Sequence, residues 1–268
     1  MTPAPVAHAA LIVDFDSPSA LILIVAAAAA LLAAVVVGRR IPGGIGAAAA
    51  MGVTVPITVF GLLSLEARRA GAGTGVDHAV LGWLLARRTW WLTRLAIMVT
   101  DLGSPAVVAA LTAAAAAAVW WQTRSPRNAI VLLATVSGAA TVSTVTKHMV
   151  TTQPPPVADR VIELIHQSGP SFPSGHATST LALAGIAAVI VGQPRSRGVR
   201  VALAAGAAVV TLAVAGTRLY LGVHWLTDVL AGLLLAGSAV LLGSAFLAPR
   251  YFTHAGPDGS MMKSAQPR

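Results

Sequence analysis

Long apolar runs separated by short polar connectors dominate this sequence. Most of the runs are close to the roughly 20 residues that a helix needs to cross the hydrocarbon core of a bilayer. We expect membrane-spanning helices at about Ser19–Val37, Ile45–Leu65, Ser104–Trp121, Asn128–Val150, Ala177–Val191, Val199–Gly216 and Trp225–Leu247. The pattern predicts an all-α fold, a polytopic transmembrane helical bundle of about six to seven spans.

One stretch, Val76–Met98, differs because it mixes arginines with apolar residues at helical spacing. We expect it to form an amphipathic interfacial helix in the headgroup layer, with its arginines either attracting anionic lipids or forming a solvated face. A cap packed against the bundle is an alternative that does not exclude the first. The positions concerned are Leu81, Leu84, Leu85, Trp91, Leu92, Leu95 and Met98, the arginines Arg87, Arg88 and Arg94, and the further tryptophans Trp83 and Trp90.

Composition supports a membrane protein and narrows the chemistry. Of the 268 residues, 56% are hydrophobic and only 10% are charged, whereas a soluble domain is usually about 25% charged. The net charge of +9 does not indicate nucleic acid, because the basic residues fall in small groups at the ends of apolar runs. The chain has no cysteine, which leaves His, Asp, Lys, Arg and Ser as the candidate chemical groups.

Arginine placement predicts the orientation of the spans. Basic residues are enriched on the cytoplasmic side, which puts the Arg39-Arg40 pair, the tail and two later connectors inside. Residues 151–174 and 218–224 then lie together on the outer face. The basic segment 66–102 would also lie outside, against the rule. The connector arginines are Arg124, Arg127, Arg195 and Arg197.

Three sets of polar residues interrupt the apolar chain at span ends on that outer face. Ionisable residues at membrane depth are costly, so each set is a functional candidate. The sets are Lys147 before the Pro154-Pro155-Pro156 loop, then Ser174-Gly175-His176, then Arg218-x5-His224-x3-Asp228.

These residue types suit phosphoryl transfer. An Asp four residues after a His can hold one ring nitrogen and leave the other able to attack, as His224 and Asp228 would. Ser174 is a good N-cap residue and Gly175 allows close backbone approach, so the free N–H groups there predict an anion site. His176 could protonate a leaving alkoxide. Phosphate oxygens would be held by the fork of Arg218 and the point charge of Lys147.

Each part taken alone has a structural explanation. A His-x3-Asp pair is usually a structural hydrogen bond, and Pro-Ser-Gly-His fits any capped helix start. Arg218 could be an interfacial anchor, and Lys147 could extend to the headgroups. The three sets together, in this order and on one side of the membrane, favour the functional interpretation.

The type 2 phosphatidic acid phosphatase superfamily carries the motifs Lys-x6-Arg-Pro, Pro-Ser-Gly-His and Ser-Arg-x5-His-x3-Asp. The second and third are similar to Phe172-Pro173-Ser174-Gly175-His176 and Thr217-Arg218-x5-His224-x3-Asp228 of this chain. The resemblance implies a phosphatase that needs no metal or other cofactor and forms a phosphohistidine. It implies that His224 is the nucleophile, Asp228 its orienting partner and His176 the acid, and that the phosphate holders are Lys147, Ser174, Gly175 and Arg218.

Two departures from the family pattern stand out besides the extra N-terminal span. Thr217 replaces the usual serine and keeps a hydroxyl. The first motif reads Lys-x6-Pro-Pro, so Pro154 stands where the family has arginine. One lost charged contact corresponds to on the order of 1.5–3 kcal/mol of binding. Arg160 is a candidate replacement if its loop folds back.

The resemblance also predicts a division of the chain. Residues 1–75 would form an N-terminal segment with one or two extra spans, ending in a flexible glycine-rich connector, Glu66–Gly75. Its Gly71-x-Gly73-x-Gly75 run follows no strand and does not predict a phosphate loop. Residues 76–247 would form the phosphatase-like domain, and residues 248–268 a disordered cytoplasmic tail.

We therefore expect a multi-pass cell-membrane enzyme with an outer-face site that acts on a lipid phosphomonoester or diphosphate. Polyprenyl diphosphate, phosphatidate, phosphatidylglycerol phosphate and a glycosylated polyprenyl phosphate are not ranked by the residues. The first alternative is a degenerate homologue that binds lipid headgroups or a protein partner. A transporter would place charges near the bilayer midplane, and a zinc site would use His176, His224 and Asp228. The oligomeric state is left open.

Overall fold

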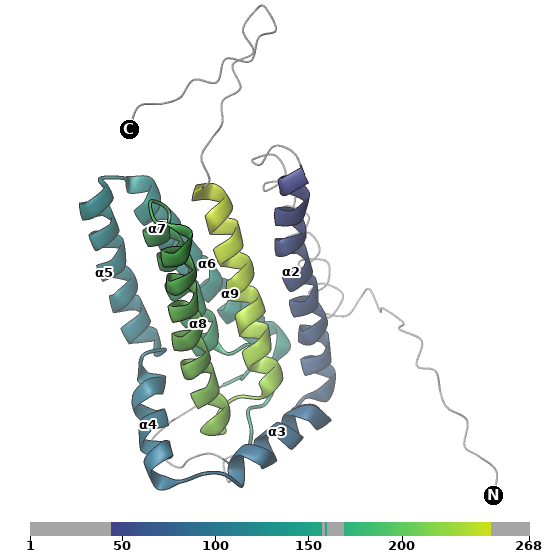
Figure 1. Cartoon of the computed structure of the whole chain (residues 1–268). Coiled ribbons are helices and arrows are strands. Elements are labelled where there is room, and N and C mark those ends of the chain that lie inside the picture. The colour runs from purple at the N-terminus through teal and green to yellow at the C-terminus, as the bar shows by residue number, and fades with distance from the viewer. Residues whose placement is uncertain (1–43, 157–158, 160–168, 248–268) are drawn as a thin grey trace, which may run out of the picture.

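The computed structural model describes residues 44–156, 159 and 169–247, and every regular element in these ranges is a helix (Figure 1). The all-α prediction is confirmed. The helices are α2 (Gly44–Ala70), α3 (Gly75–Leu85), α4 (Trp90–Asp101), α5 (Pro105–Thr123), α6 (Pro126–Val150), α7 (Gly175–Gly192), α8 (Arg197–Tyr220) and α9 (Leu226–Leu247).

Among the described residues, five helices are long and apolar enough to cross a membrane, namely α5 to α9. They coincide with the last five predicted spans. Helix α2 covers the predicted second span, contains Pro56 and continues to Ala70. The predicted first span at 19–37 and the tail at 248–268 lie outside the described residues.

The bundle is built around α7, which packs against α6, α8 and α9, while α2 packs along α9 (Figure 1). Small residues let these helices approach closely, as is common in membranes. A Cβ on Gly243 of α9 would lie 2.5 Å from Thr135 of α6, and one on Gly185 of α7 would lie 2.9 Å from Val240. The centre of the bundle is fully buried at Leu132, Ala182, Ile186 and Ala236. These contacts fix the positions of the helix ends that carry the polar motifs.

The segment predicted as one amphipathic helix forms two helices, α3 and α4, separated at residues 86–89. Tertiary contacts explain the break: the Tyr220 hydroxyl of α8 accepts from the backbone N–H of Thr89 at 3.0 Å. Trp83, Trp90 and Trp91 are exposed as expected. The guanidinium of Arg87 lies over the Trp83 ring at 4.1 Å. Periodicity alone does not reveal a break that is set by a residue so distant in sequence.

The predicted flexible connector at 66–75 is ordered and packed. Helix α2 includes its first half, and Gly71 and Gly73 then adopt positive φ values of 67° and 91°. A Cβ on Gly73 would lie 2.9 Å from the Trp225 ring, so glycine is required there by both conformation and space. The connector therefore helps to support the start of α9.

One end of the bundle collects the polar motifs. Helices α6 and α8 end there, α7 and α9 begin there, and α3 and α4 lie at the same end (Figure 1). The arginines of the α5–α6 and α7–α8 connectors, Arg124, Arg127, Arg195 and Arg197, belong to the opposite end.

Candidate functional site

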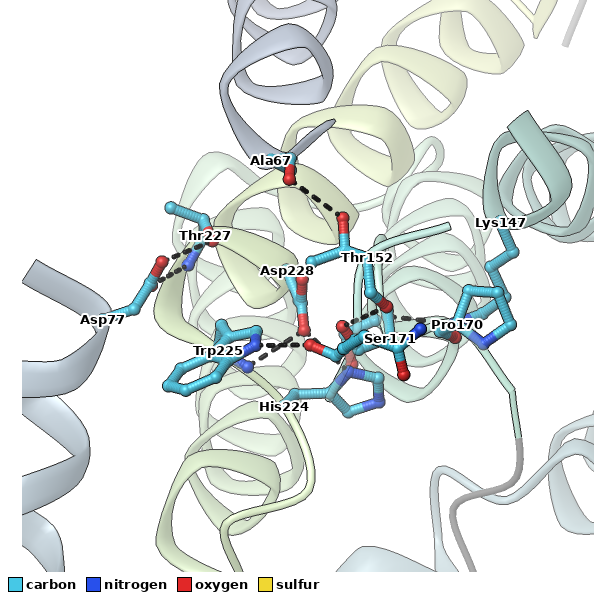
Figure 2. A network of polar contacts seen from close by, with 12 residues as sticks. Ala67, Asp77, Lys147, Thr152, Pro170, Ser171, His224, Trp225, Thr227 and Asp228 are labelled. Carbon is cyan, nitrogen blue, oxygen red and sulfur yellow. Dashed lines mark hydrogen bonds and ion pairs between the residues drawn. The ribbon is translucent and has the colours of Figure 1, made fainter. Parts of the chain in front are cut away.

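Lys147 ties the end of α6 to the loop that leads into α7. Its Nζ donates to the carbonyl oxygens of Pro170 at 3.0 Å and Ser171 at 2.9 Å (Figure 2). The backbone N–H of Ser171 donates to the Thr152 carbonyl at 2.9 Å. These contacts hold the Lys147 ammonium against residues 170–171, the part of the loop that leads into α7.

The Ser174-Gly175-His176 stretch forms the start of α7, as predicted. Ser174 is the N-cap residue, but its side chain makes no capping hydrogen bond. Its hydroxyl is buried and has no hydrogen-bond partner among the described residues. The backbone N–H of Ser174 instead donates to the Asp228 carbonyl at 2.9 Å. Ser174 therefore occupies the predicted N-cap position without a capping bond from its side chain, and the start of α7 is anchored to α9 through the backbone.

Gly232 explains how closely α7 and α9 meet here. A Cβ at this position would lie 2.7 Å from the Ser174 carbonyl oxygen and 2.9 Å from Thr178 Oγ1. Only a glycine allows the backbone of α9 to pass so near the first turn of α7.

His224 and Asp228 form a buried pair at the start of α9. His224 Nδ1 and Asp228 Oδ2 are 3.2 Å apart, and the backbone N–H of Trp225 donates to the same Oδ2 at 2.9 Å (Figure 2). The two residues are only 3% and 0% exposed. Because α9 begins at Leu226, His224 lies just before the helix and Asp228 reaches back from its first turn. The carboxylate both orients the ring and pairs one of the N–H groups that a helix start leaves without a partner.

Arg218, in the last turn of α8, is only 2% exposed and donates through Nη1 to the Thr100 hydroxyl at 3.0 Å. Asp101 lies close enough to act on its charge. The end of α4 thus contacts the Arg218 guanidinium. The sequence did not identify Thr100 as a hydrogen-bond partner of Arg218.

The predicted site residues converge around His176. Lys147, Arg218 and His224 all lie close enough to act electrostatically on this half-buried ring. A Cβ on Gly103, in the α4–α5 turn, would lie 3.1 Å from His176 Cδ2. The fold therefore gathers the three sequence sets into one cluster at the end of the bundle.

Pro154 occupies the place of the family arginine, and Arg160 lies outside the described residues. Nearby, Arg88 donates to the carbonyl oxygens of Asp159 at 2.7 Å and Tyr220 at 2.9 Å. Burial lowers the pKa of the Arg88 guanidinium, while Tyr220 and Asp159 oppose the shift. Arg88 therefore fixes the backbone immediately before Arg160.

In the described part of the chain, no three His, Cys, Asp or Glu side chains are grouped as ligands of one metal ion. The zinc arrangement of His176, His224 and Asp228 is accordingly not present in this geometry.

Two comparisons with known proteins find a similarity, one to a family model and one to a solved structure. Residues 128–251 match the family model of the PAP2 superfamily. The solved structure of a transmembrane PAP2-type phosphatidylglycerolphosphate phosphatase from Bacillus subtilis is similar, with a TM-score of 0.64 and 24% identity. The similarity covers 73% of this chain and 98% of that one. Comparison with curated protein sequences gave no significant match.

Proposed function

Because residues 128–251 match the family model of the PAP2 superfamily, we propose that this chain is an integral membrane phosphatase that removes phosphate from a lipid through a phosphohistidine. The fold is that of a PAP2-type membrane phosphatase. The observation that carries the proposal is the buried His224–Asp228 pair beside His176, Lys147 and Arg218.

The pair has the geometry of an activated nucleophile. With a proton on Nδ1 directed at Asp228, the His224 ring carries its lone pair on Nε2. In the first step Nε2 attacks phosphorus, the N–P bond forms and the P–O bond to the lipid breaks. His176 gives its proton to the departing oxygen. In the second step His176 takes a proton from water, the hydroxide attacks phosphorus and the N–P bond breaks, which restores both histidines.

The phosphate would be held by Lys147, Arg218, Ser174 and Gly175. The first N–H groups of α7 form an anion site of the kind found at helix starts. A buried Ser174 hydroxyl without a partner among the described residues supports this role, because such groups are costly unless a ligand pairs them. The cationic side chains of Lys147 and Arg218 would bind the phosphoryl oxygens of the bound lipid.

Arg160 remains our proposed substitute for the arginine that Pro154 replaces. The Arg88 contact to the Asp159 carbonyl supports it, since that contact holds the preceding residue close to the turn that leads to His224. An active Arg160→Ala variant would refute the proposal that Arg160 replaces the missing arginine. The expected result is a folded protein without activity.

We further propose that the site opens at the outer face of the cell membrane. The connector arginines at the opposite end of the bundle support this orientation. Within this scheme, residues 76–247 form the phosphatase unit and residues 1–75 add one or two spans. Such a site would act on a polyprenyl diphosphate, phosphatidate or a related lipid, without a cofactor.

The deciding experiment is phosphate release by purified full-length protein in detergent with EDTA, on a panel of lipid mono- and diphosphates. Wild type is compared with His224→Ala, and both are checked for a cooperative thermal transition. We expect release that the substitution abolishes and that EDTA does not affect. Release that EDTA abolishes would contradict metal independence. A folded wild type that releases nothing would favour the lipid-binding alternative, with Pro154 as its cause.

A further inference from the structure

Asp77 is a buried carboxylate in the first turn of α3, outside the segment that matches the family model. It is only 1% exposed and accepts four hydrogen bonds. Two come from Thr74, through its backbone N–H at 2.8 Å and its hydroxyl at 2.9 Å. The other two come from Thr227, through its backbone N–H at 2.9 Å and its hydroxyl at 3.0 Å (Figure 2).

These contacts divide into a local pair and a distant pair. The contacts with Thr74 complete a capping box at the start of α3, a common local device. The contacts with Thr227 join residues 150 positions apart. Thr227 lies in the first turn of α9, where backbone N–H groups lack partners within the helix and a negative charge is favourable. One carboxylate therefore stabilises the starts of two helices.

The start of α9 is the segment that carries the proposed nucleophile. Thr227 stands between His224 and Asp228 in the chain, and Asp228 binds both the His224 ring and the Trp225 backbone. Trp225 adds two further supports from outside α9. Its Nε1 donates to the Gln153 carbonyl at 2.8 Å, and its ring meets His78 of α3 edge-on at 4.8 Å between centroids. Helix α3 thus contacts this turn through both Asp77 and His78.

We infer that Asp77 is a positioning residue for the His224–Asp228 pair, holding the first turn of α9 so that the His224 ring keeps its orientation. The inference rests on the proposed function for its catalytic consequence. The phosphate holders Lys147, Ser174 and Arg218 stand on other elements, so loss of Asp77 should alter turnover more than substrate binding.

Asp77 also lies within electrostatic range of the Asp228 carboxylate. Removing its charge therefore changes two things, the anchor of the turn and the field at the pair. Thr227→Val separates them, because it removes one of the anchoring hydrogen bonds and leaves the charge of Asp77 in place.

The test compares Asp77→Asn, Thr227→Val and Thr74→Val in the full-length protein. An asparagine has one oxygen, so it cannot accept from both backbone N–H groups that now bind Asp77. Thr74→Val is the matched control, since it removes a threonine hydroxyl from the same carboxylate on the side of α3. Each variant is assayed for kcat and KM on the lipid that wild type prefers, with folded protein quantified by thermal unfolding in detergent.

We expect Asp77→Asn to lower kcat by about 10- to 100-fold, because small misplacements of reacting groups have effects of that size. KM should change little. Thr227→Val should lower kcat in the same direction by a smaller factor. Thr74→Val should lower the melting temperature and leave kcat unchanged.

A second readout does not depend on activity. The ring ¹⁵N chemical shifts of His224, assigned with His224→Gln in histidine-labelled protein, report its tautomer and hydrogen bonding. They should move in Asp77→Asn and Thr227→Val and stay fixed in Thr74→Val. Unchanged shifts and kcat in both of the first two variants would overturn the inference. So would a fall in kcat of equal size in Thr74→Val, which would mean that Asp77 acts on turnover through the cap of α3 and not through its contact with Thr227.

The two readouts also separate this inference from the proposed function. Wild type that hydrolyses no lipid in the panel would defeat the proposed function, and the His224 shifts would still decide whether Asp77 orients the ring.

Discussion

The starts of α7 and α9 lie at the same end of the bundle, but they differ in how their polar groups are paired. At the start of α9, carboxylates accept hydrogen bonds from the backbone N–H groups: Asp77 accepts from Thr227 and Asp228 accepts from Trp225. The first turn of α7 has no side-chain cap, and the Ser174 hydroxyl has no partner among the described residues.

The difference separates two tasks that a phosphoryl-transfer site must perform. Paired polar groups hold a side chain in one orientation, which is what a nucleophilic histidine needs. Unpaired N–H and O–H groups at a helix start can serve an anion, as a phosphate site requires. The contrast predicts that substitutions of the groups that fix the start of α9 affect turnover and that loss of the Ser174 hydroxyl at the start of α7 affects binding.

Asp228→Asn should have the largest effect on turnover and tests the α9 side of this comparison. The amide keeps the size of the side chain but loses the negative acceptor that orients His224. We expect kcat to fall by about 10³- to 10⁴-fold, the scale seen when the carboxylate that orients a catalytic histidine is neutralised. The measurement is single-turnover phosphate release. Glu66→Gln, an exposed carboxylate on α2, is the control and should behave as wild type. Near-normal turnover in Asp228→Asn would contradict the assignment of the pair.

Arg218→Lys would test the proposed role of Arg218 in binding the phosphate. Lysine keeps the charge and loses the planar fork, together with the contact to Thr100. Two charge-assisted hydrogen bonds are at stake, so we expect kcat/KM to fall by about 100-fold, mainly through KM. Arg94→Lys, on the exposed face of α4, should leave KM unchanged. If kcat falls while KM stays constant, Arg218 contacts the transition state alone and the division of tasks is wrong at this residue.

Gly232→Ala would force the two helix starts apart. The new Cβ would lie 2.7 Å from the Ser174 carbonyl, so α7 and α9 must shift, and we expect the free energy of unfolding to fall by about 1–3 kcal/mol. Gly237→Ala on the same helix meets no atom within 4 Å and should leave it unchanged or higher. Thermal unfolding in detergent measures both. Equal stability of the two variants would show that the close approach at Gly232 is not needed.

Much of this arrangement could be predicted from local sequence. Span length and apolar composition indicate the membrane helices, and the spacing of His224 and Asp228 indicates their contact. Features that depend on a contact between residues far apart in the chain could not be predicted from local sequence. The break between α3 and α4 is held by Tyr220, and Arg218 donates to Thr100, 118 positions away. Thr74-x-x-Asp77 is recognisable as a capping box, but nothing local connects Asp77 to Thr227.

Ser174→Ala has the smallest expected effect and distinguishes the two helix starts most directly. If the hydroxyl pairs with bound phosphate, its loss should raise KM by about fivefold, the value of one hydrogen bond near 1 kcal/mol. Stability without substrate should not fall, because the removed group has no partner among the described residues and its burial is unfavourable. Asp77, a carboxylate of α3 that binds the first turn of α9, should behave in the opposite way. Thermal unfolding with and without inorganic phosphate therefore gives the sharpest contrast: Ser174→Ala loses the stabilisation by phosphate, whereas Asp77→Asn loses stability already without it. A Ser174→Ala protein that is less stable in the absence of ligand would mean that this hydroxyl supports the fold, and that the start of α7 is no more open to an anion than the start of α9.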